Sequence, residues 1–432
     1  MTKKLALHWK ILIGMVLGVI WGFIAIEAGL IQFTADWIKP FGTIFINLLK
    51  LIAVPLIIVS IINGVSNLTD ISKLSRIGFK TVSLYLASTV IAIIVGLLLV
   101  NLTNPGNLFP SDKREAFQEK YEINIEEKQS AAAELKQDGP LQTIVDIVPD
   151  NIFGAMTDNS KMLQVIFFAI MFGIAMVMLP TEKTKPVKKL IDSLNEIVLK
   201  LIDIIMRGAP YGVFALLAAL IVDVSGDLNL FAALGLYGLT VIVGLLLMIF
   251  IVYPSFLSIL TKTKFFEFLR GIVPAQLLAF STSSSAATLP MTIDCCEKNL
   301  GVSKEVSSFV LPLGATINMD GTSLYQAVAA IFITQAFGYD LTLSMQLTIV
   351  LTATLASIGS AAVPGAGMVM LVIVLEAIGV PSAGIALIFA VDRPLDMLRT
   401  VVNVTGDSTI TTIVSGSEKR RMQKAAYLNQ DL

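Results

Sequence analysis

The segment DRPLDMLRTVVNVTGD, residues 392–407, places charged side chains near the end of a very apolar chain. Its polar residues follow one another at intervals of 4, 3, 4 and 4 positions: Asp392, Asp396, Arg399, Asn403 and Asp407. At about 100° per helical residue, these side chains fall in a stripe about 80° wide, with Thr400 at its edge. The segment therefore predicts a helix with one polar face, which must meet polar partners from elsewhere in the chain.

The composition indicates an integral membrane protein. The chain has 432 residues, of which 55% are hydrophobic and only 15% charged, whereas a soluble domain carries about 25% charged residues. The net charge of -1 provides no basic surface for nucleic acid. Adjacent Cys295 and Cys296 favour neither a disulfide nor a metal site, and the only histidine is His8. The core thus lacks a base for Ser-His catalysis, and we expect no enzyme.

Six apolar stretches reach the length of about 20 residues that a membrane crossing needs. They lie at roughly 11–30, 42–66, 80–103, 155–180, 197–222 and 231–259. No cleavage site precedes the first stretch, so we expect a retained helix. Lys and Arg gather in alternate short loops and in both tails, which predicts cytoplasmic N- and C-termini. Polar residues 104–150 then lie outside, as a flexible or weakly helical loop.

The last third of the chain has an irregular pattern that predicts two hairpins and a broken helix. Residues 264–298 are too few for two full crossings, and STSSSAATLP at 281–290 suits a hairpin tip. Residues 306–337 are interrupted by GATINMDGTSLYQ, which disfavours a continuous helix. The stretch LASIGSAAVPGAGMVML at 355–371 repeats the hairpin pattern. Paired interrupted segments of this kind indicate the midplane binding site of a transporter.

The charges inside the predicted membrane region need partners. At about 2.5–3.5 kcal/mol each, Asp320, Asp396, Arg399 and Asp407 would cost on the order of 10 kcal/mol if they faced lipid. A salt-bridge network that only locks helices leaves the surplus of acids unexplained. Surplus carboxylates beside broken helices favour a hard cation such as Na⁺, and the fork of Arg399 suits a carboxylate. The serine run at 282–285 fits either a simple turn or donors to a substrate carboxylate.

Four motifs, TSSSAATLP, GATINMDGT, ASIGSAAVPGAG and DMLRTVVNVTGD, occur here in this order. Together they resemble the signatures of the dicarboxylate/amino acid:cation symporters, the family of archaeal aspartate transporters and animal excitatory amino acid transporters. The resemblance covers nearly the whole chain, including NPG at 104–106. It implies an all-α integral membrane fold with eight transmembrane helices and two re-entrant helical hairpins in inverted repeats. It also implies an elevator-type transporter that forms a homotrimer.

The resemblance further implies a division of the chain into a scaffold and a transport domain. Residues 1–80 would hold scaffold helices 1 and 2, 81–103 the third helix of the transport domain, 104–150 an extracellular loop, 151–230 scaffold helices 4 and 5, 231–416 the transport-domain core (helix 6, hairpin 1, helix 7, hairpin 2 and helix 8), and 417–432 a cytoplasmic tail.

By resemblance, Arg399 binds the side-chain carboxylate of an acidic amino acid and Asp396 binds its amino group. The implied substrate-binding set is Ser284, Ser285, Thr322, Val363, Gly367, Asp396, Arg399, Thr400 and Asn403.

The resemblance also implies three sodium sites and no organic cofactor, with Na⁺ as the coupling ion. The first consists of Asp407 with Gly314, Asn318 and Asn403. The second consists of Thr316, Ser357, Ile358 and Ser360, near Met319. The third consists of Asp320 and Asn318 with Tyr85, Ser88 and Thr89.

The sequence departs from the family pattern in three ways. Gln326 stands where animal glutamate members carry a proton-carrying Glu, so we expect no proton counter-coupling. The family usually has an arginine at one of two positions, and these are occupied here by Ser283 and Met397. Arg393, three residues before Asp396, either replaces that arginine or reaches water at the helix end. Ala286 replaces a serine that many members have, which removes one hydroxyl.

These observations predict a sodium-coupled secondary active symporter for L-aspartate or L-glutamate, two substrates that differ by one methylene. It would work by elevator alternating access as a multi-pass protein of the cell membrane, with a bacterial inner membrane expected from the short tails. The alternative is a proton-coupled symporter for glutamate, aspartate or a C4-dicarboxylate. An ion channel is a third class, which differs because a channel cannot concentrate its solute.

Overall fold

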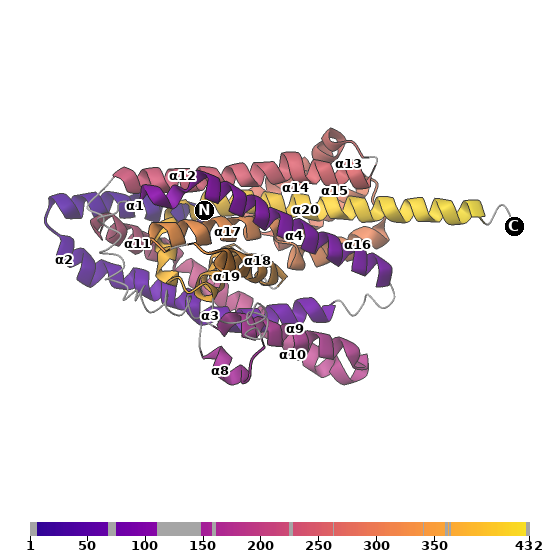
Figure 1. Ribbon diagram of the computed structural model, residues 1–432, viewed down its shortest axis with the longest axis horizontal. Helices are drawn as coiled ribbons and strands as arrows, with labels where there is room; N and C mark the ends of the chain where they lie inside the picture. The colour runs from indigo at the N-terminus through magenta and orange to yellow at the C-terminus, as the bar shows by residue number, and fades with distance from the viewer. Residues whose placement is uncertain are drawn as a thin grey trace, which may run out of the picture.

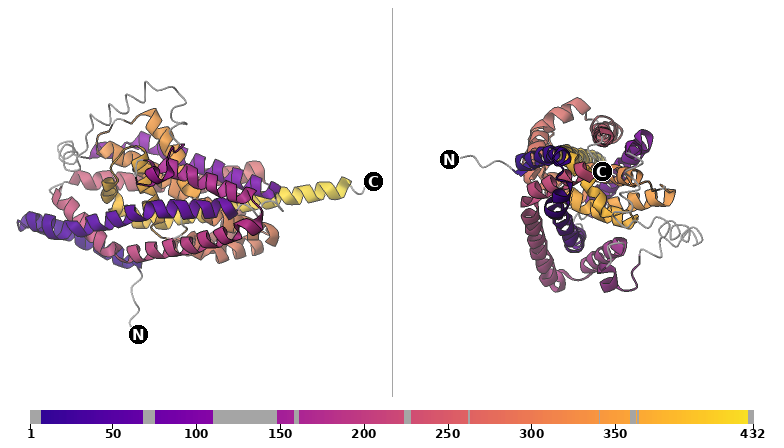
Figure 2. Two further views of the ribbon diagram at one scale, coloured as in Figure 1. Left: turned by 90° about the horizontal axis from the view of Figure 1, so that it is seen from below. Right: turned by 90° about the vertical axis from the view of Figure 1, so that its left-hand side faces the viewer.

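Every regular element in the described part of the chain is a helix, which confirms the all-α prediction. The computed structural model describes residues 7–67, 75–109, 148–157, 161–223, 228–261, 263–339, 341–358, 362 and 364–428. Figures 1 and 2 show an elongated bundle whose long helices run roughly along its long axis, with the end of the last helix projecting from it.

The N-terminal helices pack through glycines. Helix α1 (Leu7–Glu27) lies along α11 (Ala209–Asp223). A Cβ added at Gly14 would lie 2.3 Å from the Pro210 oxygen, and one at Gly18 would lie 2.6 Å from the Phe214 oxygen. The spacing of small residues at every fourth position lets the two backbones approach closely, as in membrane helix pairs. The short elements α2 (Ile31–Phe33) and η1 (Thr34–Ile38) then lead into α3 (Lys39–Asn67).

The predicted span at 197–222 is not one straight helix. Helix α8 (Ile152–Met156) and α9 (Met162–Met178) precede a continuous helix α10 (Thr181–Arg207), which meets α11 at a bend of 51°. The bend falls at Gly208 and Pro210, where proline lacks a backbone donor and glycine disfavours helix. The apolar pattern predicted the hydrophobic length but not this break, because the apolar residues at the end of α10 continue directly into the apolar helix α11.

The third and sixth apolar stretches form long helices. They are α4 (Ser75–Thr103), followed by η3 (Pro105–Leu108), and α12 (Leu228–Leu247), which continues through the π-helical turn η5 (Met248–Val252) into α13 (Tyr253–Leu260). By length and composition, four described stretches could cross a membrane, or five if the bent pair α10–α11 counts as one. Most of the polar loop predicted at 104–150, residues 110–147, lies outside the described residues.

The last third contains two pairs of helices and one interrupted helix, in the predicted order. Helices α14 (Phe265–Thr282) and α15 (Ser285–Lys298) join through Ser283, whose φ of 51° is left-handed. The interrupted helix comprises α16 (Lys304–Ile317) and α17 (Asp320–Ala336). The second pair is α18 (Leu343–Ile358) and α19 (Ala366–Ala377). After η6 (Ser382–Gly384), the helix with the polar stripe, α20, runs from Ile385 to Leu428.

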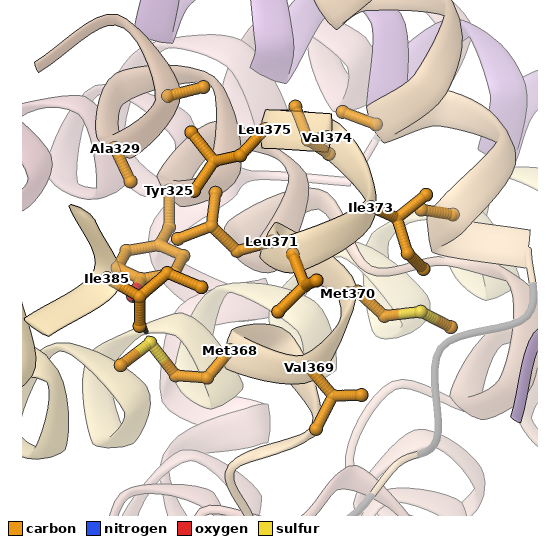
Figure 3. Packing of buried hydrophobic residues seen from close by; sticks show 14 of the residues in the cluster. Tyr325, Ala329, Met368, Val369, Met370, Leu371, Ile373, Val374, Leu375 and Ile385 are labelled. Atoms are coloured by element: carbon orange, nitrogen blue, oxygen red, sulfur yellow. Dashed lines mark hydrogen bonds between the residues drawn. The ribbon is translucent and has the colours of Figure 1, made fainter. Parts of the chain in front are cut away.

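Helices α17 and α19 form the centre of the bundle. Figure 3 shows Leu371, Leu375 and Met368 of α19 facing Tyr325 and Ala329 of α17. The Tyr325 hydroxyl donates to the Met368 sulfur at 2.9 Å. Helix α20 packs against α12, α14, α15, α16 and α17. Its polar stripe is therefore enclosed by protein. This agrees with the expectation that these charged side chains contact polar partners and not lipid.

Candidate functional site

The guanidinium of Arg399 is the buried charge at the centre of the site. Arg399 is only 1% exposed. Its Nη2 lies 2.7 Å from Asp396 Oδ1 and 3.1 Å from Asp392 Oδ1, and its Cζ lies 3.8 Å from the centroid of the Tyr325 ring. Gly321 of α17 lets the backbone of α20 approach closely here, because an added Cβ would lie 2.5 Å from the Arg399 backbone oxygen. One side of the guanidinium is therefore held by two carboxylates and an aromatic face.

The other side of Arg399 is open to a further acceptor. Within the described residues, its buried Nε and Nη1 have no hydrogen-bond partner. A Cβ added at Gly367 of α19 would lie 3.2 Å from Nη1 and 3.1 Å from Cγ2 of Thr322 on α17. The lack of a side chain at Gly367 thus leaves a small cradle between α17, α19 and α20. Two buried donors of fixed orientation facing such a cradle fit a carboxylate.

Asp396 lies between two arginines. Its Oδ1 accepts from Arg399, and its Oδ2 accepts from Arg393 Nη1 at 2.9 Å and from the Gly365 backbone amide at 3.4 Å. Arg393 is 9% exposed, so it contacts Asp396 and does not extend into water. The Thr400 hydroxyl donates to the Asp396 carbonyl at 2.8 Å. The predicted pair of Arg399 and Asp396 is formed, and Thr400 lies one helical turn after Asp396.

The tips of the two helix pairs touch. Ser284 caps α15 by accepting from the Ala287 amide at 3.1 Å, and its hydroxyl donates to the Ala362 carbonyl at 2.6 Å. The Ala286 amide also donates to that carbonyl, at 3.4 Å. Ser285 is buried beside this contact. Val363 lies outside the described residues. The serine run therefore acts in the turn, and it also links the first tip to the second.

Asn403 connects the polar stripe to the break in the interrupted helix. Its Oδ1 accepts from the Gly321 amide at 2.8 Å. Its Nδ2 lies 3.3 Å from both the Met319 sulfur and the Thr322 hydroxyl. Asn403 thus lies close to Met319 and Thr322, because α20 packs against α17.

Asp407 lies beside the end of α16. The Asn318 amide donates to Asp407 Oδ1 at 2.9 Å. A Cβ added at Gly314 would lie 2.5 Å from the same oxygen, so only glycine leaves room for it. Tyr85 turns its hydroxyl to the Val310 carbonyl at 3.0 Å. The buried carboxylate of Asp407 thus lies at the end of α16, where it accepts from the Asn318 side chain, and a carboxylate is a ligand that suits a hard cation.

Asp320 accepts hydrogen bonds from hydroxyl groups on two other helices, α4 and α13. Its Oδ1 accepts from Thr89 at 2.9 Å and from Ser88 at 3.1 Å, and Ser88 also lies 3.2 Å from Asn318 Oδ1. Its Oδ2 accepts from the Tyr253 hydroxyl at 2.9 Å. Of the predicted group, the structure brings together Asp320, Asn318, Ser88 and Thr89, whereas the Tyr85 hydroxyl donates to the Val310 carbonyl. Sequence reasoning missed Tyr253, which lies 67 residues before Asp320 in an apolar stretch.

The remaining predicted group is only partly described. Thr316 is exposed and its hydroxyl donates to the Leu313 carbonyl at 2.9 Å. Ser357 is buried and donates to the Thr354 carbonyl at 2.8 Å, and Ile358 ends α18 next to it. Ser360 lies outside the described residues. The carbonyls concerned come from the last turns of α16 and α18, which pack against each other and carry partial negative charge.

Gln326 of α17 is buried against the start of α19. It is 1% exposed, and its Nε2 donates to the Gly367 carbonyl at 3.3 Å. An amide at this position holds the first turn of α19 and cannot carry a proton.

Comparison with known proteins shows the family of the chain. Residues 7–417 match the model of the Sodium:dicarboxylate symporter family. The Proton/sodium-glutamate symport protein of Geobacillus stearothermophilus is 36% identical over 434 residues, covering 99% of both chains. Excitatory amino acid transporter 3 of Oryctolagus cuniculus is 35% identical over 459 residues, covering 96% of this chain and 87% of that protein. The resemblance read from the four motifs is confirmed, and the chain belongs to the sodium:dicarboxylate symporter family.

Proposed function

We propose that this protein is a sodium-coupled secondary active symporter of acidic amino acids, L-aspartate or L-glutamate. The observation that carries the proposal is the buried Arg399, held by carboxylates on one side and with two unpartnered donors on the other. A zwitterion with an acidic side chain supplies the carboxylate that those donors need. Relatives named as glutamate symport proteins and excitatory amino acid transporters support the same substrate class.

Each predicted residue has a role in the proposed complex. Arg399 binds the side-chain carboxylate, and Asp396 binds the amino group, which replaces one of its guanidinium contacts. The buried hydroxyls and amides of the first tip, at Ser284 and Ser285, hold the α-carboxylate. Around the substrate lie the remaining members of the set: Thr322, Val363, Gly367, Thr400 and Asn403.

The same geometry supports Na⁺ as the coupling ion. Asp407 with Gly314, Asn318 and Asn403 would hold one ion, and Asp320 with Asn318, Ser88, Thr89 and Tyr85 another. The helix-end carbonyls near Thr316, Ser357, Ile358 and Ser360, with Met319, would hold a third. The proposed ligands in all three sets are oxygen atoms, which suit a hard monovalent cation; the Met319 sulfur is the one exception. Asn318 contacts Asp407 and Ser88 and so joins two of the ion sites, while Asn403 also contacts Thr322 of the substrate set. These links would make the binding of ions and substrate interdependent.

Proton coupling is the alternative function. The name of the Geobacillus relative includes protons as well as sodium. Gln326 counts against protons here, because a buried amide has no titratable group at this position. The test is accumulation of radiolabelled L-aspartate in proteoliposomes under an inward sodium gradient. Accumulation under an inward proton gradient alone would favour the alternative.

The proposed architecture follows the family. Eight crossings and two re-entrant hairpins, α14–α15 and α18–α19, would build a transport domain from residues 81–103 and 231–416. This domain would move as an elevator against a scaffold of residues 1–80 and 151–230. We place the protein in a bacterial inner membrane, with both termini in the cytoplasm. The concentration of Lys and Arg in alternate loops supports that orientation.

We further propose a homotrimer that associates partly through α10. Exposed apolar residues recur on this helix at intervals of 4, 3, 4 and 3 positions: Leu190, Leu194, Ile197, Leu201 and Ile204. This is the spacing of a coiled-coil seam. Charged residues such as Asp192, Glu196 and Lys200 accompany the seam, which disfavours lipid as its cover.

Polar substitution of this seam is expected to dissociate the trimer. Ile197→Gln combined with Leu201→Gln removes two apolar contacts from each subunit, and light scattering of the purified protein in detergent should show a monomer. Leu98→Gln on α4, where Leu98 is 66% exposed, is the matched control and should leave the mass unchanged. A trimer that survives the double substitution would show that α10 is not the seam.

A further inference from the structure

Tyr253 is a buried aromatic residue placed at the site by an irregularity of its helix. It begins α13 directly after the π-helical turn η5, and it is 0% exposed. A π-helical turn inserts a residue and shifts the faces of the helix that follows, and such turns are frequent at functional sites. Here the shift directs one tyrosine of an otherwise apolar stretch toward the start of α17.

The Tyr253 hydroxyl has two acceptors on two helices. It lies 2.9 Å from Asp320 Oδ2 on α17 and 3.2 Å from the Val402 carbonyl on α20. A phenol has a single proton, so the shorter contact to the carboxylate is the stronger and the Val402 contact the weaker. Val402 directly precedes Asn403, whose side chain holds the Gly321 amide. Tyr253 therefore joins the carboxylate to the backbone that carries a predicted substrate ligand.

The two oxygens of Asp320 have separate partners. Oδ1 accepts from Ser88 and Thr89 of α4. Within the described residues, the only side chain that donates to Oδ2 is Tyr253. Ser88 and Thr89 are short side chains whose hydroxyls can rotate to admit a cation. The tyrosine ring is locked by packing, so its hydroxyl fixes the rotation of the carboxylate.

Gly406 leaves room for this arrangement. A Cβ added there would lie 2.7 Å from the Tyr253 hydroxyl, 3.0 Å from Asn318 Nδ2 and 3.1 Å from Asp320 Oδ2. The glycine immediately before Asp407 thus faces the point where Tyr253, Asn318 and Asp320 meet. The close packing leaves the hydroxyl little freedom to move away from the carboxylate.

We infer that Tyr253 is a positioning residue for the coupling-ion site at Asp320. By holding Oδ2, it presents Oδ1 to the space bounded by Ser88, Thr89 and Asn318, where the ion would bind. The inference rests on the proposed sodium coupling, and it adds a residue that does not itself touch the ion. Loss of the hydroxyl should weaken sodium binding and leave the substrate cradle at Arg399 unchanged.

The test is Tyr253→Phe in the full-length protein, which keeps the ring and removes only the hydroxyl. We expect the sodium concentration for half-maximal binding of radiolabelled L-aspartate to rise about tenfold, as for loss of one hydrogen bond to a charged group. The aspartate dissociation constant at saturating sodium should change less than about twofold. Sodium without aspartate should also raise the melting temperature less than in the wild type. The control is Tyr339→Phe, whose hydroxyl has no described partner and should not matter.

Two further variants keep the inference testable. Gly406→Ala retains the tyrosine but displaces its hydroxyl, so it should raise the half-maximal sodium concentration in the same direction. In an Asp320→Asn background, Tyr253→Phe should add little, because both changes act on one group. An unchanged sodium titration in Tyr253→Phe, or in Gly406→Ala if Tyr253→Phe does not fold, would overturn the inference. A wild-type protein that binds aspartate equally in sodium and choline would instead overturn the proposed function.

Discussion

Replacement of Arg399 by cysteine is expected to abolish L-aspartate uptake. Arg399 is 1% exposed and lies 2.7 Å from Asp396 and 3.1 Å from Asp392. Truncating one partner of a buried, hydrogen-bonded charge pair in a complex costs about 2–5 kcal/mol, which corresponds to a loss in affinity of about thirtyfold to several thousandfold. The substrate carboxylate would then face Asp392 and Asp396, with Arg393, already paired with Asp396, as the remaining cation. Aspartate binding to the purified variant at saturating sodium measures the effect.

The variant should also change which substrates are accepted. With the guanidinium gone, the cradle beside Thr322 and Gly367 gains space and loses its positive charge. Small neutral amino acids should then compete better than aspartate, since Asp396 still binds an amino group. Arg207→Cys is the matched control, because Arg207 is an exposed arginine paired with Asp203 on α10. Unchanged aspartate affinity in Arg399→Cys would remove Arg399 from the substrate site.

Replacement of Asp407 by asparagine is expected to weaken the sodium dependence of binding by more than about tenfold. The change keeps the shape of the side chain and removes its charge, while Asp407 Oδ1 is the acceptor for Asn318 at 2.9 Å. A neutral amide oxygen is a weaker ligand for a hard cation than a carboxylate. The measurement is a sodium titration of aspartate binding, with the aspartate affinity at saturating sodium as the second readout.

An exposed aspartate provides the control for this second variant. Asp203→Asn on α10 removes a carboxylate that pairs with Lys200 and Arg207 at the surface. It should leave the sodium titration unchanged. If Asp407→Asn shows the same sodium response as the wild type, Asp407 is not a sodium ligand and its charge serves only the packing of α16 against α20.

Much of the site could be predicted from local patterns. The spacing from Asp392 to Asp407 predicted the polar face of α20, and Asn318 to Gly321 predicted the break between α16 and α17. Both are short-range signals, in which a helical period or poor helix formers act within a few residues. The Arg393–Asp396 contact was predictable for the same reason, since the two residues are three positions apart on one helix.

The features that were missed depend on contacts between distant segments. Tyr253 meets Asp320 because a π-helical turn rotates α13, and no periodicity in an apolar stretch reveals such a turn. The link from Ser284 to Ala362 joins tips that lie 78 residues apart. The bend between α10 and α11 was also missed, because hydropathy records the total apolar length and not the helix direction.

The central claim is that a sodium gradient drives acidic amino acid uptake through this protein. In the most direct measurement, proteoliposomes are loaded with potassium buffer and placed in sodium buffer of the same pH. The uptake of radiolabelled L-aspartate is then followed. A parallel sample has choline outside and an inward proton gradient. The account predicts internal aspartate above the external concentration with sodium and only background with protons. Accumulation with protons and none with sodium would contradict it, and mere equilibration in both would indicate a channel.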